Sequence, residues 1–344
     1  MKFMNKIVNK ISKEISYQTS RYTVPPEFLS LIITMRCNFR CQSCSIWQKP
    51  HDDELNEDSW KEIISKLPDT LKPNTFVEIN GGEPLARKDL TFFLIKELKK
   101  RFKKVTLNSN GLLINEEILE ELGEAGLDTI KISFYSLKKE KHNSLRGHPL
   151  AFEHAKKAID LIFKSNINLE VGLLVTSENI KDAPALIEYL QKLQNVSIIL
   201  QPLDEIIESK ESKDLSSNKL ISNLWPEKND VNKFFDWVVD NNGSIKNSTA
   251  NIKAIRQYYL NPNEILKYRC FAGQRNLVVY PNGDVTFCFK GGIIGNLEKR
   301  DVGQIIRNAT DERKKIKHCK KYCRIVGCNF SRGYSEFVRD RINT

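Results

Sequence analysis

The sequence predicts an α/β protein built around a parallel sheet, on two observations. Six short apolar runs alternate with five longer stretches whose apolar residues recur every three or four positions. The short runs have the length of strands, whereas the longer stretches have the period of helices with one buried face. Strands that alternate with such helices are joined by crossover connections, which place neighbouring strands parallel.

The elements follow one another along the chain. The predicted strands are Leu29–Thr34, Thr75–Asn80, Lys104–Asn108, Thr129–Phe134, Asn168–Val175 and Val196–Gln201. The predicted helices between them are Glu57–Leu67, Leu90–Phe102, Asn115–Gly123, Ala151–Ser165 and Asp182–Leu193. A polar, irregular stretch then predicts a connector or a lid at Asp204–Asn229, followed by two further helices at Val231–Val239 and Ala250–Leu260.

An amphipathic basic helix is predicted near the N-terminus. Four apolar residues are spaced four apart with lysines between them, namely Phe3, Ile7, Ile11 and Ile15. This is the spacing of one helix face. The helix docks on the main domain in one interpretation and makes peripheral contact with a membrane surface in the other.

Length and cysteine usage limit the class of protein. A chain of 344 residues with 40% hydrophobic residues exceeds the size at which one core usually stops growing, so two domains are expected. No apolar run reaches the ~18 residues of a membrane span, and the N-terminus lacks a secretory signal. Eight cysteines, clustered three and five, fit metal ligation better than a disulfide framework, so a cytoplasmic location is expected.

The chain is basic, with a formal charge of +11 and a pI of about 9.1. This charge favours acidic partners, such as nucleic acid, anionic small molecules, acidic peptides or an anionic membrane. A lysine-rich composition with solvated helix faces is the alternative explanation. No basic motif with interleaved aromatic residues supports nucleic acid as a partner.

Cys37, Cys41 and Cys44 form a C-x3-C-x2-C triplet directly after the first predicted strand. Three thiolates on one short loop can bind three irons of a cubane cluster, which leaves the fourth iron without a protein ligand. A small molecule can bind that iron and receive an electron there. A zinc site is one alternative, with His51 as a distant fourth ligand, and spare cysteines are the other.

Two turns with unusual composition follow the next strands. Gly81-Gly82-Glu83-Pro84 follows the second strand, where glycines let a ligand approach the backbone and Glu83 can accept from a cation. A plain Gly-Gly turn is the alternative. The third strand ends at Asn108 in an Asn-Ser-Asn-Gly turn. Because parallel strands end at the active face of such a sheet, these turns and the triplet are expected to lie together.

The C-terminal part of the chain holds the other cysteines, Cys270, Cys288, Cys319, Cys323 and Cys328. Residues 277–287 consist of a strand, an Asn-Gly turn and a second strand, which predicts a β-hairpin. The hairpin brings Cys270 near Cys288. A Gly-Asn turn at 295–296 and a helix over 302–317 follow, and a zinc ribbon is one interpretation of this pattern.

The triplet and the Gly81–Pro84 motif together resemble the radical S-adenosylmethionine (radical SAM) superfamily. The resemblance covers about residues 27–203 and implies a partial (β/α)6 barrel. It implies that Cys37, Cys41 and Cys44 hold a [4Fe-4S] cluster whose open iron binds the amino and carboxylate groups of SAM. Reductive cleavage of SAM then yields a 5′-deoxyadenosyl radical, which abstracts a hydrogen atom from a substrate.

The same resemblance implies roles for cofactor-binding residues. Gly81, Gly82, Glu83 and Pro84 match a motif that binds the amino group of SAM. Asn108 lies in a turn that faces the cluster, and Ser133 matches a serine that contacts SAM.

Arg146 matches an arginine that reaches the SAM carboxylate, because a guanidinium can bind a carboxylate through two hydrogen bonds. A surface salt bridge is the alternative role for Arg146. Many family members have an aromatic residue where this chain has Ser43, so Phe39 or Trp47 is expected beside the adenine.

The C-terminal cysteines resemble the SPASM or twitch extension of the family, a small α+β cluster-binding domain. Seven cysteines hold two auxiliary clusters in the full pattern, so five imply one auxiliary [4Fe-4S] cluster. The expected ligands are Cys270, Cys288, Cys319 and Cys323, with Cys328 as the alternative to Cys319 or Cys323. The basic stretch Lys299–Arg324 either raises the potential of this cluster or lies on a solvated helix face.

Four segments are expected: 1–27, the N-terminal helix and linker; 28–203, the barrel; 204–262, a connector with helices; and 263–344, the auxiliary-cluster domain and C-terminal helix. The expected activity is radical SAM oxidation or maturation of a peptide or of a sugar-like small molecule. The expected electron donor is a flavodoxin or ferredoxin. A tRNA-modifying radical SAM enzyme and a non-catalytic iron–sulfur electron carrier are the alternatives.

Overall fold

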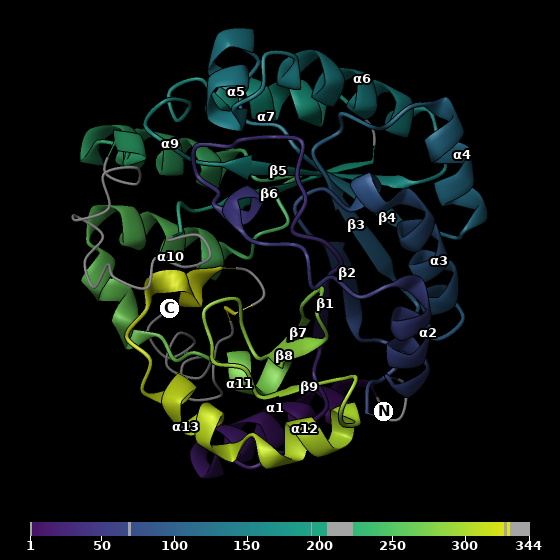
Figure 1. The fold of residues 1–344 in the computed structure, drawn as a ribbon. Helices are drawn as coiled ribbons and strands as arrows, with labels where there is room; N and C mark the ends of the chain where they lie inside the picture. The colour runs from purple at the N-terminus through teal and green to yellow at the C-terminus, as the bar shows by residue number, and fades with distance from the viewer. Residues whose placement is uncertain (1, 68–69, 194, 205–222, 327–328, 331–344) are drawn as a thin grey trace.

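The computed structural model describes residues 2–67, 70–193, 195–204, 223–326 and 329–330, with side chains from residue 11 onward. The strands of these residues form one nine-stranded sheet in the order β6-β5-β4-β3-β2-β1-β7-β8-β9 (Figure 1). They are β1 (Phe28–Ile32), β2 (Phe76–Asn80), β3 (Val105–Ser109), β4 (Thr129–Ser133), β5 (Asn168–Leu174), β6 (Val196–Gln201), β7 (Asn276–Val279), β8 (Asp284–Thr286) and β9 (Gly295–Asn296).

Strands β1 to β6 are parallel and form a partial barrel, which confirms the predicted fold class. The helices that connect them cover the outer face of the barrel (Figure 1). They are α2 (Glu57–Lys66), α3 (Lys88–Lys99), α4 (Glu116–Glu124), α5 (Lys139–Arg146), α6 (Ala151–Phe163) and α7 (Ala183–Gln191). All carboxyl ends of the six strands therefore open at one end of the barrel.

Local sequence explains these helices. On α3, Leu90, Leu94 and Leu98 recur every four residues and are at most 4% exposed, so one helix face packs on the sheet. Asn56 begins α2 by accepting a hydrogen bond from the Ser59 amide at 2.9 Å, as helix caps do. Helix α5 was not expected from the sequence, because its residues are too polar to show a clear apolar period.

The C-terminal hairpin extends the sheet of the barrel and does not form a sheet of its own. Strand β7 pairs in parallel with the free edge of β1, and β8 and β9 continue the same sheet antiparallel. Gly283, with φ of +80°, occupies the predicted turn. An unpaired strand edge leaves backbone groups without partners, and β7 supplies them for β1.

Helices of the C-terminal half flank this hairpin and the open side of the barrel. They are α9 (Lys228–Asp240), α10 (Thr249–Leu260), α11 (Ala272–Arg275), α12 (Val302–Asn308) and α13 (Thr310–Lys317). The single helix expected over 302–317 is therefore two helices, broken at Ala309. Asn308 and Thr310 flank the break, and both residue types have low helix propensity.

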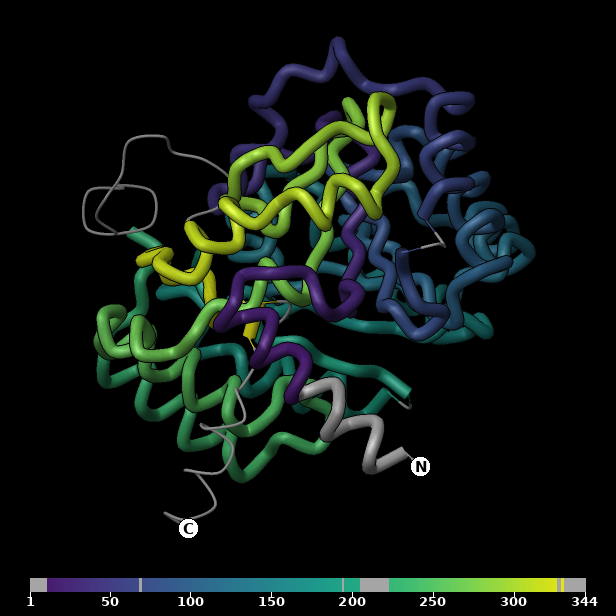
Figure 2. The backbone as a smooth tube through the Cα atoms, turned by 90° about the horizontal axis from the view of Figure 1, so that it is seen from below, coloured from purple at the N-terminus to yellow at the C-terminus, as the bar shows by residue number. Residues whose placement is uncertain are grey.

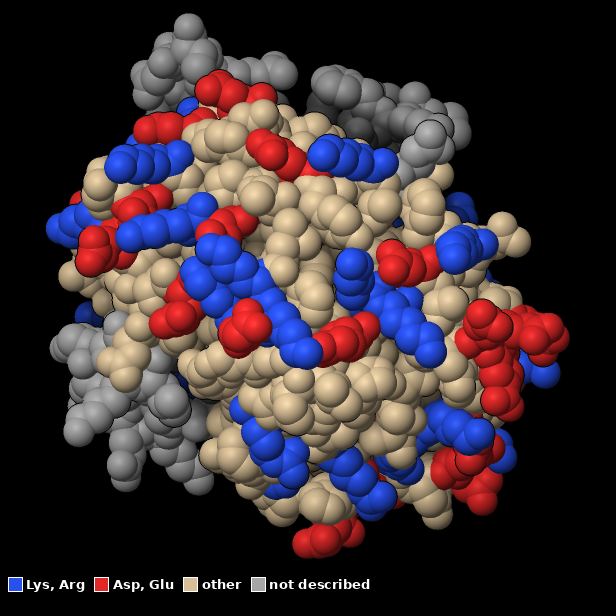
Figure 3. Space-filling model, turned by 90° about the horizontal axis from the view of Figure 1, so that it is seen from above, with Lys and Arg blue, Asp and Glu red and all other residues tan. Residues whose placement is uncertain are grey.

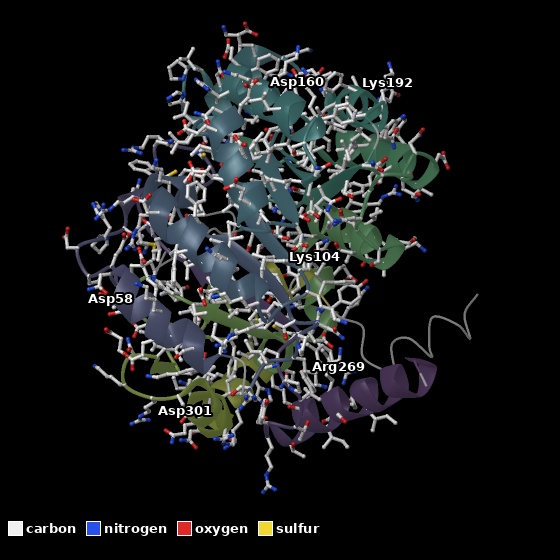
Figure 4. All side chains as sticks on the ribbon, turned by 90° about the vertical axis from the view of Figure 1, so that its right-hand side faces the viewer. Asp58, Lys104, Asp160, Lys192, Arg269 and Asp301 are labelled. Carbon is white, nitrogen blue, oxygen red and sulfur yellow. The ribbon has the colours of Figure 1, made fainter. Side chains whose placement is uncertain are left out.

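The N-terminal helix α1 (Lys2–Thr19) lies beneath the barrel, beside the C-terminal helices (Figure 2). Arg269 reaches it and pairs with Glu14, with 2.7 Å between Nη1 and Oε1 (Figure 4). The Tyr17 ring packs against Phe271, with ring centroids 4.9 Å apart. This end of α1 thus docks on the segment that carries Cys270, in agreement with the docking interpretation.

Membrane contact remains a prediction. No helix within the described ranges combines the length and the apolar character that crossing a membrane requires. Ile11 and Ile15 on α1 are about half exposed.

Leu277 tests whether the hairpin shares the barrel core. It lies on β7, is fully buried and belongs to the same apolar cluster as the barrel residues. We expect Leu277→Ala to lower the free energy of unfolding by about 2–5 kcal/mol, measured by urea denaturation. Leu113→Ala, at a 39% exposed position, is the control. Equal effects of the two substitutions would contradict a shared core.

Candidate functional site

A cavity of about 330 Å³ opens at the carboxyl ends of the barrel strands, where the predicted site residues meet. Eight of the residues predicted for SAM and its cluster line this cavity, namely Cys37, Cys41, Cys44, Gly81, Gly82, Asn108, Ser133 and Arg146. Glu83 and Pro84 are not among the lining residues. The far wall is formed by the end of β6, the residues that follow it and the C-terminal segment, namely Gln201, Pro202, Asp204 and Val326.

The loop that carries the triplet packs directly on the backbone of Gly81 and Gly82. The Gly82 amide donates to the Thr34 carbonyl at 2.8 Å, and the Glu83 amide donates to the Arg36 carbonyl at 2.8 Å. A Cβ atom on Gly81 would lie 2.6 Å from the Thr34 oxygen, and one on Gly82 would overlap the Arg36 carbonyl. The two glycines are therefore required by the approach of two backbones.

The other side of the same loop packs on the end of α5. The Gln42 amide donates to the Leu145 carbonyl at 3.1 Å, and the Gln42 side chain reaches Ser144. Gly147 ends α5 with φ of +59°, and a Cβ there would overlap the Arg40 carbonyl. Helix α5 thus acts as the second wall of the cysteine loop.

Glu54 fixes the start of the loop, and no pattern in the sequence predicts this role. Its side chain is 3% exposed and accepts from the Thr34 hydroxyl at 2.9 Å and the Met35 amide at 2.6 Å. Arg87 donates to the Ile33 carbonyl at 2.9 Å and lies 3.6 Å from the Glu54 carboxylate. In the sequence, Glu54 stands within a run of acidic residues that looks like an exposed turn.

Glu83 lies behind the cavity wall. Its fully buried carboxylate accepts from the Ser109 hydroxyl at 2.9 Å and from the Asn110 amide at 2.8 Å. Burial raises the pKa of Glu83, and these hydrogen bonds oppose the shift. In this structure Glu83 joins the turn after β2 to the turn after β3, and Pro84 begins the short helix η2 (Pro84–Arg87).

Arg146 is buried and sits over two aromatic rings. Its guanidinium lies 5.3 Å from the Phe39 ring centroid and 5.1 Å from that of Tyr135. It donates to the Tyr135 hydroxyl at 3.0 Å, while its Nε has no partner among the described residues. Arg146 is therefore not in a surface salt bridge, and it retains donors for an anionic group.

Aromatic side chains border the cavity where the sequence has Ser43 in place of an aromatic residue. Phe39 stacks on His148, with centroids 4.6 Å apart, and is 1% exposed. Trp47 donates through Nε1 to the Cys44 carbonyl at 2.8 Å. Both residues expected beside the adenine line the cavity.

The triplet thiols are partly buried. Burial raises the pKa of Cys37 to about 11 and also raises the pKa of Cys44. Metal-free thiols of this kind are protonated near neutral pH, so metal binding must release protons. Within the described ranges no three Cys, His, Asp or Glu side chains converge on one metal ion. Such convergence is needed for zinc, whereas each thiolate of a cubane cluster binds a different iron.

The C-terminal cysteines gather beside the far wall of the cavity. Cys270 and Cys323 are buried, and Cys288 and Cys319 are partly exposed. The four thiols influence one another electrostatically, and burial raises the pKa of Cys288 to about 12. Cys328 lies outside the described residues. The seven cysteines that the structure describes are free.

Two arginines of the basic stretch Lys299–Arg324 are buried. This corrects the interpretation that the basic side chains of the stretch all lie on one solvated helix face. Arg324 donates to the carbonyls of Leu266, Tyr268, Cys319 and Lys321. Arg313 is 1% exposed and donates to the Gly273 carbonyl at 2.9 Å. Both guanidiniums therefore join segments that carry the C-terminal cysteines.

Gly82→Ala should prevent the cysteine loop from taking its place, since the new Cβ would overlap the Arg36 carbonyl. We expect the variant, after anaerobic reconstitution, to lose the iron of one cluster, about four atoms per chain. Gly243→Ala is the matched control, because no atom lies within 4 Å of a Cβ there. Iron analysis of both proteins measures the effect. Full iron content in Gly82→Ala would show that the close approach is not required.

Comparison with known proteins agrees with this arrangement. Residues 31–190 match the model of the radical SAM superfamily, and residues 270–329 match the SPASM model, an iron–sulfur cluster-binding domain. The AdoMet-dependent heme synthase of Methanosarcina barkeri is 28% identical over 177 residues, which are 51% of this chain and 50% of the relative. The chain thus spans about half the length of this curated relative.

Two solved structures share the fold at low identity. Streptococcus suis SuiB bound to the precursor peptide SuiA has 16% identity and a TM-score of 0.66 over 88% of this chain and 69% of that chain. The anSMEcpe structure with bound AdoMet has 16% identity and a TM-score of 0.64 over 92% of this chain and 96% of that chain. With both family models and this fold in place, the chain belongs to the radical SAM superfamily and carries a C-terminal SPASM iron–sulfur cluster-binding domain.

Proposed function

We propose that this protein cleaves SAM reductively and uses the resulting 5′-deoxyadenosyl radical to abstract a hydrogen atom from its substrate. One observation carries the proposal: a single cavity is lined by the three triplet cysteines, the Gly81–Gly82 backbone and the buried Arg146. A [4Fe-4S] cluster on the three thiolates supplies the electron and the open iron that this chemistry needs.

The side chains of the cavity suit the parts of SAM. Arg146 is buried, and its Nε has no partner in the part of the chain that the structure describes, so it is suited to bind a carboxylate. Phe39 and Trp47 offer apolar surface for a nucleobase. Asn108 and Ser133 line the same cavity with neutral polar groups.

The substrate is proposed to be a peptide or a sugar-like small molecule that binds at the far wall. Asp204 on this wall pairs with Lys290 behind it, with 2.7 Å between Oδ1 and Nζ. The wall therefore presents a carboxylate and the Gln201 amide, which suit hydroxyl or amide donors better than an anion. SuiB and anSMEcpe have been crystallised with peptides, which supports the peptide alternative, whereas the heme synthase supports a small molecule.

One auxiliary [4Fe-4S] cluster is proposed on Cys270, Cys288, Cys319 and Cys323. Lys290 follows Cys288 and contacts Asp204 of the cavity wall, so this group of thiols adjoins the substrate end of the cavity. A cluster here is placed to take an electron from a substrate radical or to bind the substrate.

The net charge of +11 supports an acidic electron donor such as flavodoxin or ferredoxin. On the face shown in Figure 3, basic and acidic side chains are interspersed. This face offers no continuous basic footprint for nucleic acid. The free thiols support a reducing compartment, and we propose a cytoplasmic location.

The first test is anaerobic reconstitution followed by iron and sulfide analysis, then incubation with dithionite and SAM. We expect about eight irons per chain, and formation of 5′-deoxyadenosine detected by mass spectrometry. In the Cys37→Ala/Cys41→Ala/Cys44→Ala variant, about half the iron and all 5′-deoxyadenosine should be lost. A parent protein with about four irons and no SAM cleavage would refute the proposal.

The auxiliary ligand set has its own test. Cys323→Ala should lose the iron of the auxiliary cluster, about four atoms, while SAM cleavage continues on the triplet cluster. Cys328→Ala is the matched variant and should keep both clusters. Full iron content in Cys323→Ala, together with a loss of iron in Cys328→Ala, would show that Cys328 binds the auxiliary cluster in place of Cys323.

A further inference from the structure

Below the cavity, the barrel interior holds a chain of buried charges that the proposed chemistry does not use. Lys131 on β4 lies between two carboxylates, 2.5 Å from Glu78 Oε1 on β2 and 3.3 Å from Glu170 Oε1 on β5. Lys246 pairs with the second oxygen of Glu170 at 2.6 Å. The side chains of Glu78 and Glu170 are 9% and 5% exposed, and neither residue lines the cavity.

Glu78 connects this chain of charges to two amides of the cavity wall. The Asn80 amide nitrogen donates to Glu78 Oε2 at 3.3 Å and to the Ser30 hydroxyl oxygen at 2.7 Å. The Asn108 amide nitrogen in turn donates to the Asn80 oxygen. Asn80 and Asn108 both line the cavity.

The charge on Glu78 fixes the direction of both amides. A carboxylate that is paired with a buried lysine is ionised and can only accept hydrogen bonds. Asn80 must therefore turn its nitrogen toward Glu78 and its oxygen toward Asn108, and Asn108 must turn its nitrogen toward Asn80. The Asn108 oxygen is left, and it is buried without a partner among the described residues.

We propose that Lys131 and Glu78 are positioning residues that hold Asn108 as a hydrogen-bond acceptor in the cavity wall. The wall then selects a ligand group that carries an O–H or N–H, because a carbonyl or carboxylate would leave two acceptors facing each other. A hydroxyl is such a group, and the ribose of an adenosyl ligand supplies one. This inference rests on the proposed SAM site.

The test compares two ligands in cluster-loaded enzyme under anaerobic conditions, S-adenosylhomocysteine and its 2′,3′-di-O-methyl counterpart, whose ribose oxygens can accept hydrogen bonds but cannot donate them. Equilibrium dialysis gives the Kd of each. Wild type should prefer the ligand with hydroxyls by about tenfold or more, the effect of leaving one buried acceptor unpaired. In Glu78→Gln the preference should largely vanish, because a glutamine amide can donate to Asn80 and lets both amides turn over, so that the Asn108 nitrogen can donate to a methylated ribose oxygen.

Glu170→Gln is the matched control. It removes the other carboxylate from Lys131 but contacts neither Asn80 nor Asn108, so the preference should persist. Asn108→Ala is the second variant, which removes the acceptor without touching the buried charges and should also abolish the preference. Melting curves of all three variants verify that they fold.

The outcomes separate the inference from the function on which it rests. If Glu78→Gln keeps the wild-type preference as Glu170→Gln does, or if wild type shows none, the inference is overturned. If wild type binds neither ligand, the proposed SAM site itself fails. Loss of the preference in both Glu78→Gln and Asn108→Ala, with retention in Glu170→Gln, supports the inference.

Discussion

The close approach of the cysteine loop to the Gly81–Gly82 backbone is the contact on which the site depends. Backbone amides of Gly82 and Glu83 hold the carbonyls of Thr34 and Arg36, and side chains at the two glycines would block this contact. Gly147 has the same relation to Arg40 on the other side of the loop. Three glycines thus let a loop without regular structure lie between the turn after β2 and the end of α5.

Buried charges then support the loop and the cavity from behind. The carboxylates of Glu54 and Glu83 accept hydrogen bonds from the loop and turns around the cavity. The Arg324 guanidinium donates to four backbone carbonyls near the C-terminal cysteines. Buried polar and charged groups are stable only when their hydrogen bonds are satisfied. Glu54, Glu83 and Arg324 each satisfy this condition through hydrogen bonds to loops and turns, so their role is to connect these segments.

Residues with a local signature could be predicted from the sequence. The triplet, the Gly81–Gly82 turn and the six parallel strands are encoded by spacing and period, and the structure places them together. Glu54 and the Lys131 chain of charges could not be found, because their partners are distant in sequence. Glu83 stands behind the wall instead of on it. The break at Ala309 and the short helix α5 were missed because the first interrupts an otherwise helical pattern and the second is too polar to show an apolar period. The domain boundaries and the role of Cys328 stay predictions.

The pairing of β1 with both β2 and β7 has a consequence for how this architecture can vary. The triplet loop follows β1, and Cys288 lies just beyond β8, the neighbour of β7. Hydrogen-bond register across three adjacent strands therefore sets the spacing between the two groups of thiols. The length of chain between β6 and β7 does not enter that spacing. Insertions between β6 and Cys270 can therefore reshape the far wall of the cavity while the spacing between the triplet and Cys288 is kept.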